Sequence, residues 1–308
     1  MHHWAIAAMF CAGAVGMQAC ARAQPQPQAQ RTFDSASDAG AALFDAVQKN
    51  DDAALVSLFG PKASALIWSG DAAADKNSRE TFVEKYQQMH RVGLDADNRM
   101  TLFVGAENWP MPIPLTSQDG KWHFDTDAGE REVLYRRIGR NEEAAIRVCD
   151  ALVAAEHEYY GSAHDGVASH QYAQHFVSAP GRHDGLFWQD GAGESDSPIG
   201  PLLAFAASEE AAKAAGHGRL PFRGYYFRIL KAQGANAAGG ARDYVVDGHM
   251  TDGVAFLAYP AEYRSSGVMT FMVGPDGAVY EKDLGATVED QASALTTFDP
   301  DGTWQRAE

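Results

Sequence analysis

One long helical pattern, over residues 128–160, constrains the fold of this chain more than any other feature. Its apolar residues recur at three-, four- and seven-residue spacings, which places them along one stripe of a helix. They are Leu134, Ile138, Ala145, Ile146, Cys149, Leu152, Val153, Tyr159 and Tyr160. Because an interior glycine costs about 1 kcal/mol relative to alanine, we expect a kink or break at Gly139, after which Asn141 restarts the helix as an N-cap.

The length and charge of the chain limit what it can be. Its 308 residues exceed a typical domain of about 100–200, so we expect two domains sharing the long helix. With 25 basic and 41 acidic side chains the net charge is -16. Such a surface repels phosphate backbones and anionic lipid heads, which disfavours nucleic acid as a partner.

The N-terminus has the composition of a targeting segment. Residues 4–17 are almost wholly apolar or small but too short to span a bilayer, which predicts a signal peptide over residues 1–23. Two cleavage sites stay open. Residues 21–23 form a small-x-small site that releases a soluble protein, whereas the residues before Cys20 resemble a degenerate lipobox that would anchor the chain to a membrane. Either way the protein is expected to be periplasmic or secreted.

The front half reads as helices followed by strands. Residues 24–32 are polar and contain proline, which predicts a linker, and folding should begin near Phe33. Helical patterns begin at Ser37 or Asp38 and cover 52–59 and 78–89, and strand patterns cover 100–105, 113–116 and 121–125. This order resembles the cystatin-like cone of the nuclear-transport-factor-2 superfamily. We therefore expect an α+β domain with a curled antiparallel sheet over residues 33–137.

The back half is dominated by strand patterns. Residues 161–201 read as long loops, and the alanine-rich residues 204–215 predict a short helix. Strand-like runs at 224–233, 243–246, 253–263, 267–274 and 278–284 are separated by glycine, proline or Asp-Gly turns. Such short connections require antiparallel neighbours. Residues 138–308 should thus form an α+β domain in which the long helix packs on a four-stranded meander.

The back half also resembles a known class of domain. Residues 140–160 together with PFRGYYF at 221–227, AFLAYPAEY at 255–263 and GVMTFMVGPDGAVYEKDLG at 267–285 are similar to the globular part of type IV pilins and pseudopilins. In those domains a helix end packs on an antiparallel meander. The chain departs from them because a whole domain, rather than an exposed apolar helix, precedes this region.

A second resemblance covers almost the whole exported chain. The phrases WHFDTDAGEREVLYRRIGRNEEAAI at 122–146, SGVMTFMV at 266–273, YEKDLG at 280–285 and TTFDPDGTW at 296–304 resemble the bacterial envelope family called domain of unknown function 2950. The resemblance implies a secreted or periplasmic protein without an established activity. It therefore supplies no catalytic residues.

Known catalytic patterns are missing from the sequence. There is no Gly-x-Ser-x-Gly elbow, no HExxH and no phosphate-binding GxxxxGK[ST]. Cys149 is the single cysteine beyond the leader region, so it cannot form an intramolecular disulfide, and its place on the apolar stripe indicates a buried core residue. We assign no catalytic residue and no cofactor, and expect a protein without enzymatic activity.

Three groups of residues are candidates for binding. An apolar ligand pocket in the front domain, or simply its core, would be lined by Trp68, Trp109, Met111 and Trp122. Metal ligands, or solvated loop side chains, are His157, His164, His170 and His175, followed by His183. A tyrosine-rich sheet edge that binds another protein would contain Tyr225, Tyr226, Tyr259 and Tyr263.

The leading hypothesis is that this tyrosine edge binds another envelope protein. A front-domain pocket that serves a small-ligand binder or a hydrolase is the first alternative. A histidine-based metal binder is the second.

Overall fold

The computed structural model describes residues 29–61, 63–68, 72–165, 170–188, 196–201, 203–204 and 220–307. The predicted signal peptide, Cys20 and most of the helix predicted over 204–215 lie outside these residues. The chain divides into two compact units, Met1–Gly129 (unit 1) and Glu130–Glu308 (unit 2), whereas the sequence pattern placed the boundary between 137 and 138. Among the described helices, none has the length and hydropathy needed to cross a membrane.

Unit 1 begins with helices whose ends are set by polar side chains. The hydroxyl of Ser35 accepts a hydrogen bond of 3.1 Å from the backbone N–H of Asp38, so the first helix starts earlier than Ser37. The Asp51 carboxylate caps the second helix in the same way, at 2.9 Å from the N–H of Ala54. The helices are α1 (Ala36–Gln48), α2 (Asp52–Phe59), α3 (Ser64–Ile67) and α4 (Ala72–Gln88).

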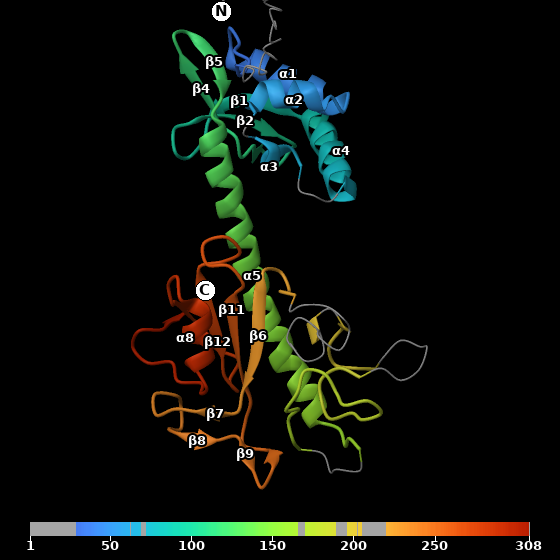
Figure 1. Cartoon of the computed structure of the whole chain (residues 1–308), viewed down its shortest axis with the longest axis vertical. Coiled ribbons are helices and arrows are strands. Elements are labelled where there is room, and N and C mark those ends of the chain that lie inside the picture. Colours follow the sequence, from blue (N-terminus) through green and yellow to red (C-terminus); the bar gives the residue numbers. More distant parts are fainter. Residues whose placement is uncertain are drawn as a thin grey trace, which may run out of the picture. The chain divides into compact units, whose positions relative to one another are not determined.

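An antiparallel sheet follows and packs against these helices (Figure 1). Its strands are β1 (His90–Leu94), β2 (Met100–Val104), β3 (Trp109–Pro110), β4 (Leu115–Gln118) and β5 (Lys121–Phe124). Their order is β1-β2-β4-β5, with β3 also paired to β2. The structure confirms the three predicted strands, but the sequence pattern missed β1, because its alternation of polar and apolar residues is short, and the two-residue β3. Leu43, Leu58 and Leu102 lie in the core of unit 1.

Part of the predicted linker belongs to unit 1. The side-chain amide of Gln30 donates to the carbonyl oxygens of Leu58, at 2.8 Å, and Phe124, at 2.7 Å. The backbone N–H of Arg31 donates to Ser57 at 2.8 Å. The prediction of a linker through residue 32 was therefore wrong at its end, because a polar side chain there satisfies carbonyls at the ends of α2 and β5.

Helix α5 (Thr126–Tyr160) continues through Gly139 without the predicted break. Its first turn is capped by Asp125, whose Oδ1 accepts a 3.0 Å hydrogen bond from the N–H of Ala128. Further along, Cys149 and Leu152 are fully buried in the core of unit 2. Burial of this stripe outweighs the roughly 1 kcal/mol cost of one glycine.

Unit 2 contains a five-stranded antiparallel sheet in the order β14-β13-β12-β11-β6, one strand more than predicted. The run at 243–246 is not part of it, because its residues form two small ribbons, β7 with β8 and β9 with β10. The strands are β6 (Tyr225–Leu230), β7 (Ala232–Gln233), β8 (Arg242–Asp243), β9 (Val245–Val246), β10 (His249–Met250), β11 (Ala255–Pro260), β12 (Met269–Val273), β13 (Val279–Asp283) and β14 (Gln305–Arg306). Helix α8 (Val288–Ala294) lies between β13 and β14 in the chain.

Both faces of this sheet are covered (Figure 1). The guanidinium of Arg228 in β6 donates to the carbonyls of Ala292 and Leu295 at the end of α8. Three residues earlier, on the opposite face of the pleat, Tyr225 is buried beside α5, where burial and the neighbouring Glu142 raise the pKa of its hydroxyl. Every residue of β11 is consequently buried.

Polar side chains of α5 also hold the loop that precedes β12. Arg137 donates to the carbonyl of Ser265 at 3.2 Å, and Asn141 donates to that of Ser266 at 2.8 Å. One oxygen of Glu142 accepts from the N–H groups of residues 268 and 269, at 2.8 and 3.0 Å. The phrase RRIGRNEEAAI of the helix and the phrase SGVM of the hairpin therefore meet in space, which gives both a structural role.

Candidate functional site

The predicted tyrosine edge is largely interior. Tyr225 is 0% exposed, and its hydroxyl donates to the carbonyl of Met269 at 2.9 Å. Tyr259 is also buried, so the prediction of an exposed edge was wrong for these two residues. The reason is that helices cover both faces of the sheet. Tyr226 and Tyr263 remain half-buried and are the part of this surface that solvent reaches.

The histidines of the loop region do not converge on one point. His157, His170 and His175 are exposed, while His164 is half-buried. Within the described residues, no three His, Cys, Asp or Glu side chains are grouped as metal ligands. The structure therefore offers no assembled metal centre there.

Two histidines instead pack on aromatic rings at the end of α5. The ring of His164 stacks on Tyr159 with centroids 3.9 Å apart, and its Nε2 lies 3.1 Å from the Tyr159 carbonyl oxygen. His183 stacks on Trp188 at 4.6 Å, and Trp188 is 5.7 Å from His164. Burial, followed by the charge of Glu156, raises the pKa of Tyr159 to about 12. These contacts make the cluster a packing centre for the loops.

Glu156, an acidic residue next to His157 in the sequence, lies in the core of unit 2 and, among the described residues, is not grouped with the histidines as a metal ligand. It is 0% exposed; Oε2 accepts a 2.8 Å hydrogen bond from the N–H of Ala173, and Oε1 has no hydrogen-bond partner. Burial raises the pKa of this carboxyl well above 4.5, which favours the protonated form. Its spacing of four residues from Leu152 and seven from Cys149, on the apolar stripe, is the signal that identifies it.

Cys149 is confirmed as a core residue. It is fully buried, and burial together with the nearby Asp150 raises the pKa of its thiol to about 12. A thiol with such a pKa does not supply a thiolate at neutral pH.

Two of the predicted front-domain pocket residues are exposed, and the other two pack against the core of unit 1. Trp68 is 39% and Trp109 is 41% exposed. Met111 and Trp122 are half-buried, and the backbone of Trp122 pairs with that of Phe33. None of the four lines the groove found in this unit, described next.

This groove runs between α1 and α4 and has a volume of about 440 Å³. Val47 is buried and Val83 half-buried, whereas the polar lining residues are mostly exposed. Arg79 is fixed by an ion pair of 2.8 Å with Asp52. The groove therefore has an apolar base and a charged rim. Its lining residues are Val47, Gln48, Asn50, Lys76, Arg79, Glu80, Val83 and Glu84.

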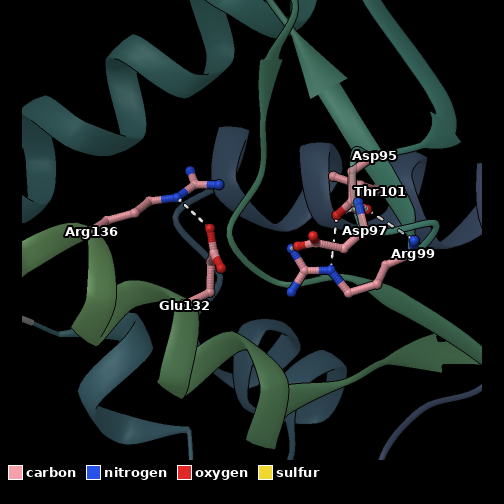
Figure 2. A network of polar contacts seen from close by, with 6 residues as sticks. All are labelled: Asp95, Asp97, Arg99, Thr101, Glu132 and Arg136. Carbon is pink, nitrogen blue, oxygen red and sulfur yellow. Dashed lines mark hydrogen bonds and ion pairs between the residues drawn. The ribbon is translucent and has the colours of Figure 1, made fainter. Parts of the chain in front are cut away.

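A second feature of unit 1 is the rigid turn between β1 and β2. Figure 2 shows Asp95 inside this turn, where Oδ1 accepts from the backbone N–H groups of Asp97 and Arg99, both at 2.9 Å. Its Oδ2 accepts from the Arg99 guanidinium, at 2.9 Å, and from the hydroxyl of Thr101, at 3.2 Å. Burial raises the pKa of Asp95, but these hydrogen bonds and the charge of Arg99 outweigh burial, so the pKa is lowered overall.

Figure 2 also draws an ion pair within α5. Arg136 and Glu132 are one helical turn apart, with Nε and Oε1 separated by 2.9 Å. Such a pair supports the helix locally and adds a few tenths of a kcal/mol.

Comparison with known proteins places the chain in a family without an assigned activity. The family model described as "Protein of unknown function (DUF2950)" matches residues 30–307. Searches of curated proteins and of solved structures found no similar chain. The match begins at Gln30, the residue whose side chain starts the packing of unit 1. Since the model covers most of the sequence, this chain belongs to the DUF2950 family.

Proposed function

We propose that this chain is an exported, non-catalytic protein of the cell envelope that acts by binding another envelope protein. Its predicted leader, residues 1–23, either is removed to release a soluble protein or leaves it anchored through a lipid on Cys20. The partner is a protein rather than nucleic acid, because the net charge is -16.

The groove between α1 and α4 is the observation that carries this proposal. Its apolar base and charged rim follow the usual layout of a protein-binding surface. Its two basic lining residues are engaged in ion pairs, Arg79 with Asp52 and Lys76 with Glu80, and its two valines are buried or half-buried. These residue types support recognition of another protein's surface.

The test is to fill the groove with a bulky side chain. Gln48 lines the groove and Gln87 of α4 does not, yet both are exposed, so Gln48→Trp and Gln87→Trp form a matched pair. We expect wild type and Gln87→Trp to capture the same partner from the producer's envelope, and Gln48→Trp to retain less than about one tenth of it. Equal capture by both variants, measured by quantitative mass spectrometry, would exclude the groove as the binding site.

A small-ligand binder is the second candidate, and the size of the groove favours it. About 440 Å³ lies within the range of roughly 300–1,000 Å³ typical of ligand pockets. Native mass spectrometry of the protein purified from its own envelope should then show an added small mass that Gln48→Trp loses. An unmodified mass in every sample would leave the protein-binding proposal in place.

Two finer fold assignments form part of this proposal. Helices followed by an antiparallel sheet in unit 1 support the cystatin-like interpretation, and α5 on a meander in unit 2 supports the pilin-like one. An experimental structure superposed on both fold classes tests each assignment separately.

A further inference from the structure

Strand β1 presents an unused hydrogen-bonding edge. In the described residues β1 pairs with β2 and with no other strand, and it ends the sheet order. The N–H of Gly105 donates to Met89 at one end of this pair, and that of Asp95 donates to Arg99 at the other, both at 2.9 Å. In an antiparallel pair, bonded positions alternate with unbonded ones. His90, Val92 and Leu94 therefore point their N–H and C=O groups away from β2.

Of the devices that normally block strand addition, this edge has a short length and one exposed charged side chain, Arg91. It contains no proline, no lysine and no bulge, since all five residues pair in regular register with β2. Leu94 is 59% exposed. The side chains that could cover the edge are held elsewhere: His90 stacks on Tyr86 at 3.8 Å, and the Arg91 guanidinium lies 4.0 Å from the Phe103 ring centroid.

We infer that two copies of this chain pair through β1, antiparallel and about a two-fold axis at Val92. In this register Val92 faces its own equivalent, and each outward residue donates one hydrogen bond and accepts one. His90 faces Leu94 of the second copy, which covers its exposed side chain. The result is one continuous antiparallel sheet built from two copies of unit 1.

The sequence of the strand favours a second copy as the occupant. The register that uses all five residues is symmetric about the middle residue, and because the backbone groups of Val92 point outward, the central pair of this register is a hydrogen-bonded one. Arg91 faces Gly93 of the second copy, so no two charged side chains oppose each other. Within one copy, Gly93 also leaves room for that copy's own Arg91 side chain, because a Cβ on it would lie 2.7 Å from an Arg91 nitrogen.

The net charge predicts how this dimer responds to salt. Each copy carries -16, so screening should strengthen association as ionic strength rises. One strand pair buries little area, and the dissociation constant should be on the order of tens of micromolar. The edge shares no lining residue with the α1–α4 groove, so loss of one proposal leaves the other intact.

The first experiment measures mass against concentration for the chain beginning at Gln24, by sedimentation equilibrium. The variant Leu94→Lys places a charge on the edge, and Leu220→Lys, at a residue 58% exposed in unit 2, is its matched control. We expect Leu94→Lys to weaken dimerisation at least tenfold and Leu220→Lys to leave it unchanged. A wild-type chain that stays monomeric at about 200 µM in high salt, or a Leu94→Lys variant that dimerises like wild type, overturns the inference.

The second experiment tests the register. Bonded antiparallel positions have Cα atoms about 5.5 Å apart, within the range of a disulfide. Val92→Cys should therefore form a disulfide-linked dimer under mild oxidation, whereas Leu94→Cys, displaced from the axis, should not. The native Cys149 is fully buried and does not compete. Cross-linking through Leu94→Cys but not through Val92→Cys would overturn the proposed axis.

Discussion

The two units stabilise their β-hairpins by different means. In unit 1, Asp95 accepts hydrogen bonds from groups at most six residues away, so the turn at residues 95–99 is held from within. In unit 2, the loop at residues 264–268 is held by side chains of α5, and Glu142 lies 126 positions from one of the N–H groups that it accepts. The first hairpin is thus specified by local sequence. The second also has hydrogen bonds of its own, such as that from the N–H of Ser266 to the carbonyl of Glu262 at 2.9 Å, but the N–H groups of Val268 and Met269 have their acceptor only when α5 is docked on the sheet.

The largest loss of stability should come from removing the carboxylate of Glu142. Glu142→Ala leaves the N–H groups of Val268 and Met269 without their carboxylate acceptor, and we expect it to lower the free energy of unfolding of unit 2 by about 3 kcal/mol. Hydrogen exchange should accelerate across the loop and β12. Glu142→Gln, which keeps an acceptor oxygen, should lose about a third as much. A loss below about 0.5 kcal/mol for Glu142→Ala would show that the loop does not depend on α5.

Removing the carboxylate of Asp95 should lower the free energy of unfolding less, and the loss should fall on unit 1. Asp95→Ala deletes four hydrogen bonds in one turn, and we expect a loss of about 2 kcal/mol with faster exchange in β1 and β2. Because the pKa of Asp95 is lowered in the folded protein, its contribution is present above its ordinary value of 3.8 and is lost as pH falls through the folded pKa. The difference between wild type and variant should therefore shrink in acid. Unchanged exchange in β1 would refute the local role of Asp95.

Glu156 is a second carboxyl of α5, and unlike Glu142 it is fully buried and accepts one hydrogen bond instead of two. The raised pKa of Glu156 means that, above pH 4.5, the folded protein keeps a proton that the unfolded chain has released. The free energy of unfolding should then fall by about 1.4 kcal/mol per pH unit from about pH 4.5 toward the folded pKa. Glu156→Gln should remove this slope. Urea titrations at several pH values measure it, and parallel profiles for both proteins would exclude the proton uptake.

The contrast between local and long-range contacts also explains which parts of the fold could be predicted from the sequence. The bounds of α2 and α5 follow from local periodicity and capping residues, and both were predicted to within about two residues, although the break predicted at Gly139 is absent. The positions of Tyr225 and Tyr259 depend on what covers the sheet. Alternation in a strand indicates which residues share a face, but not that α8 returns to cover the second face.

The candidate sites likewise divide into those that depend on local sequence and those that depend on how distant elements pack. That Cys149 is buried could be predicted, because it lies on a stripe visible in the sequence. The groove between α1 and α4 could not, since its lining comes from two helices whose packing angle no local pattern specifies. The predicted Trp68 and Trp109 pocket failed for that reason: aromatic composition indicates that apolar surface exists, not where a concavity forms.

The smallest expected effect concerns two glycines of α5 that look equivalent in the sequence. A Cβ at Gly139 would meet no atom within 4 Å, so Gly139→Ala should stabilise the protein by about 1 kcal/mol through helix propensity alone. A Cβ at Gly129 would lie 2.8 Å from the side chain of Ile113, so Gly129→Ala should instead destabilise unit 1. Thermal unfolding of the pair measures both signs. If Gly139→Ala were destabilising, that result would indicate a bend in the helix at Gly139, as the sequence pattern predicted.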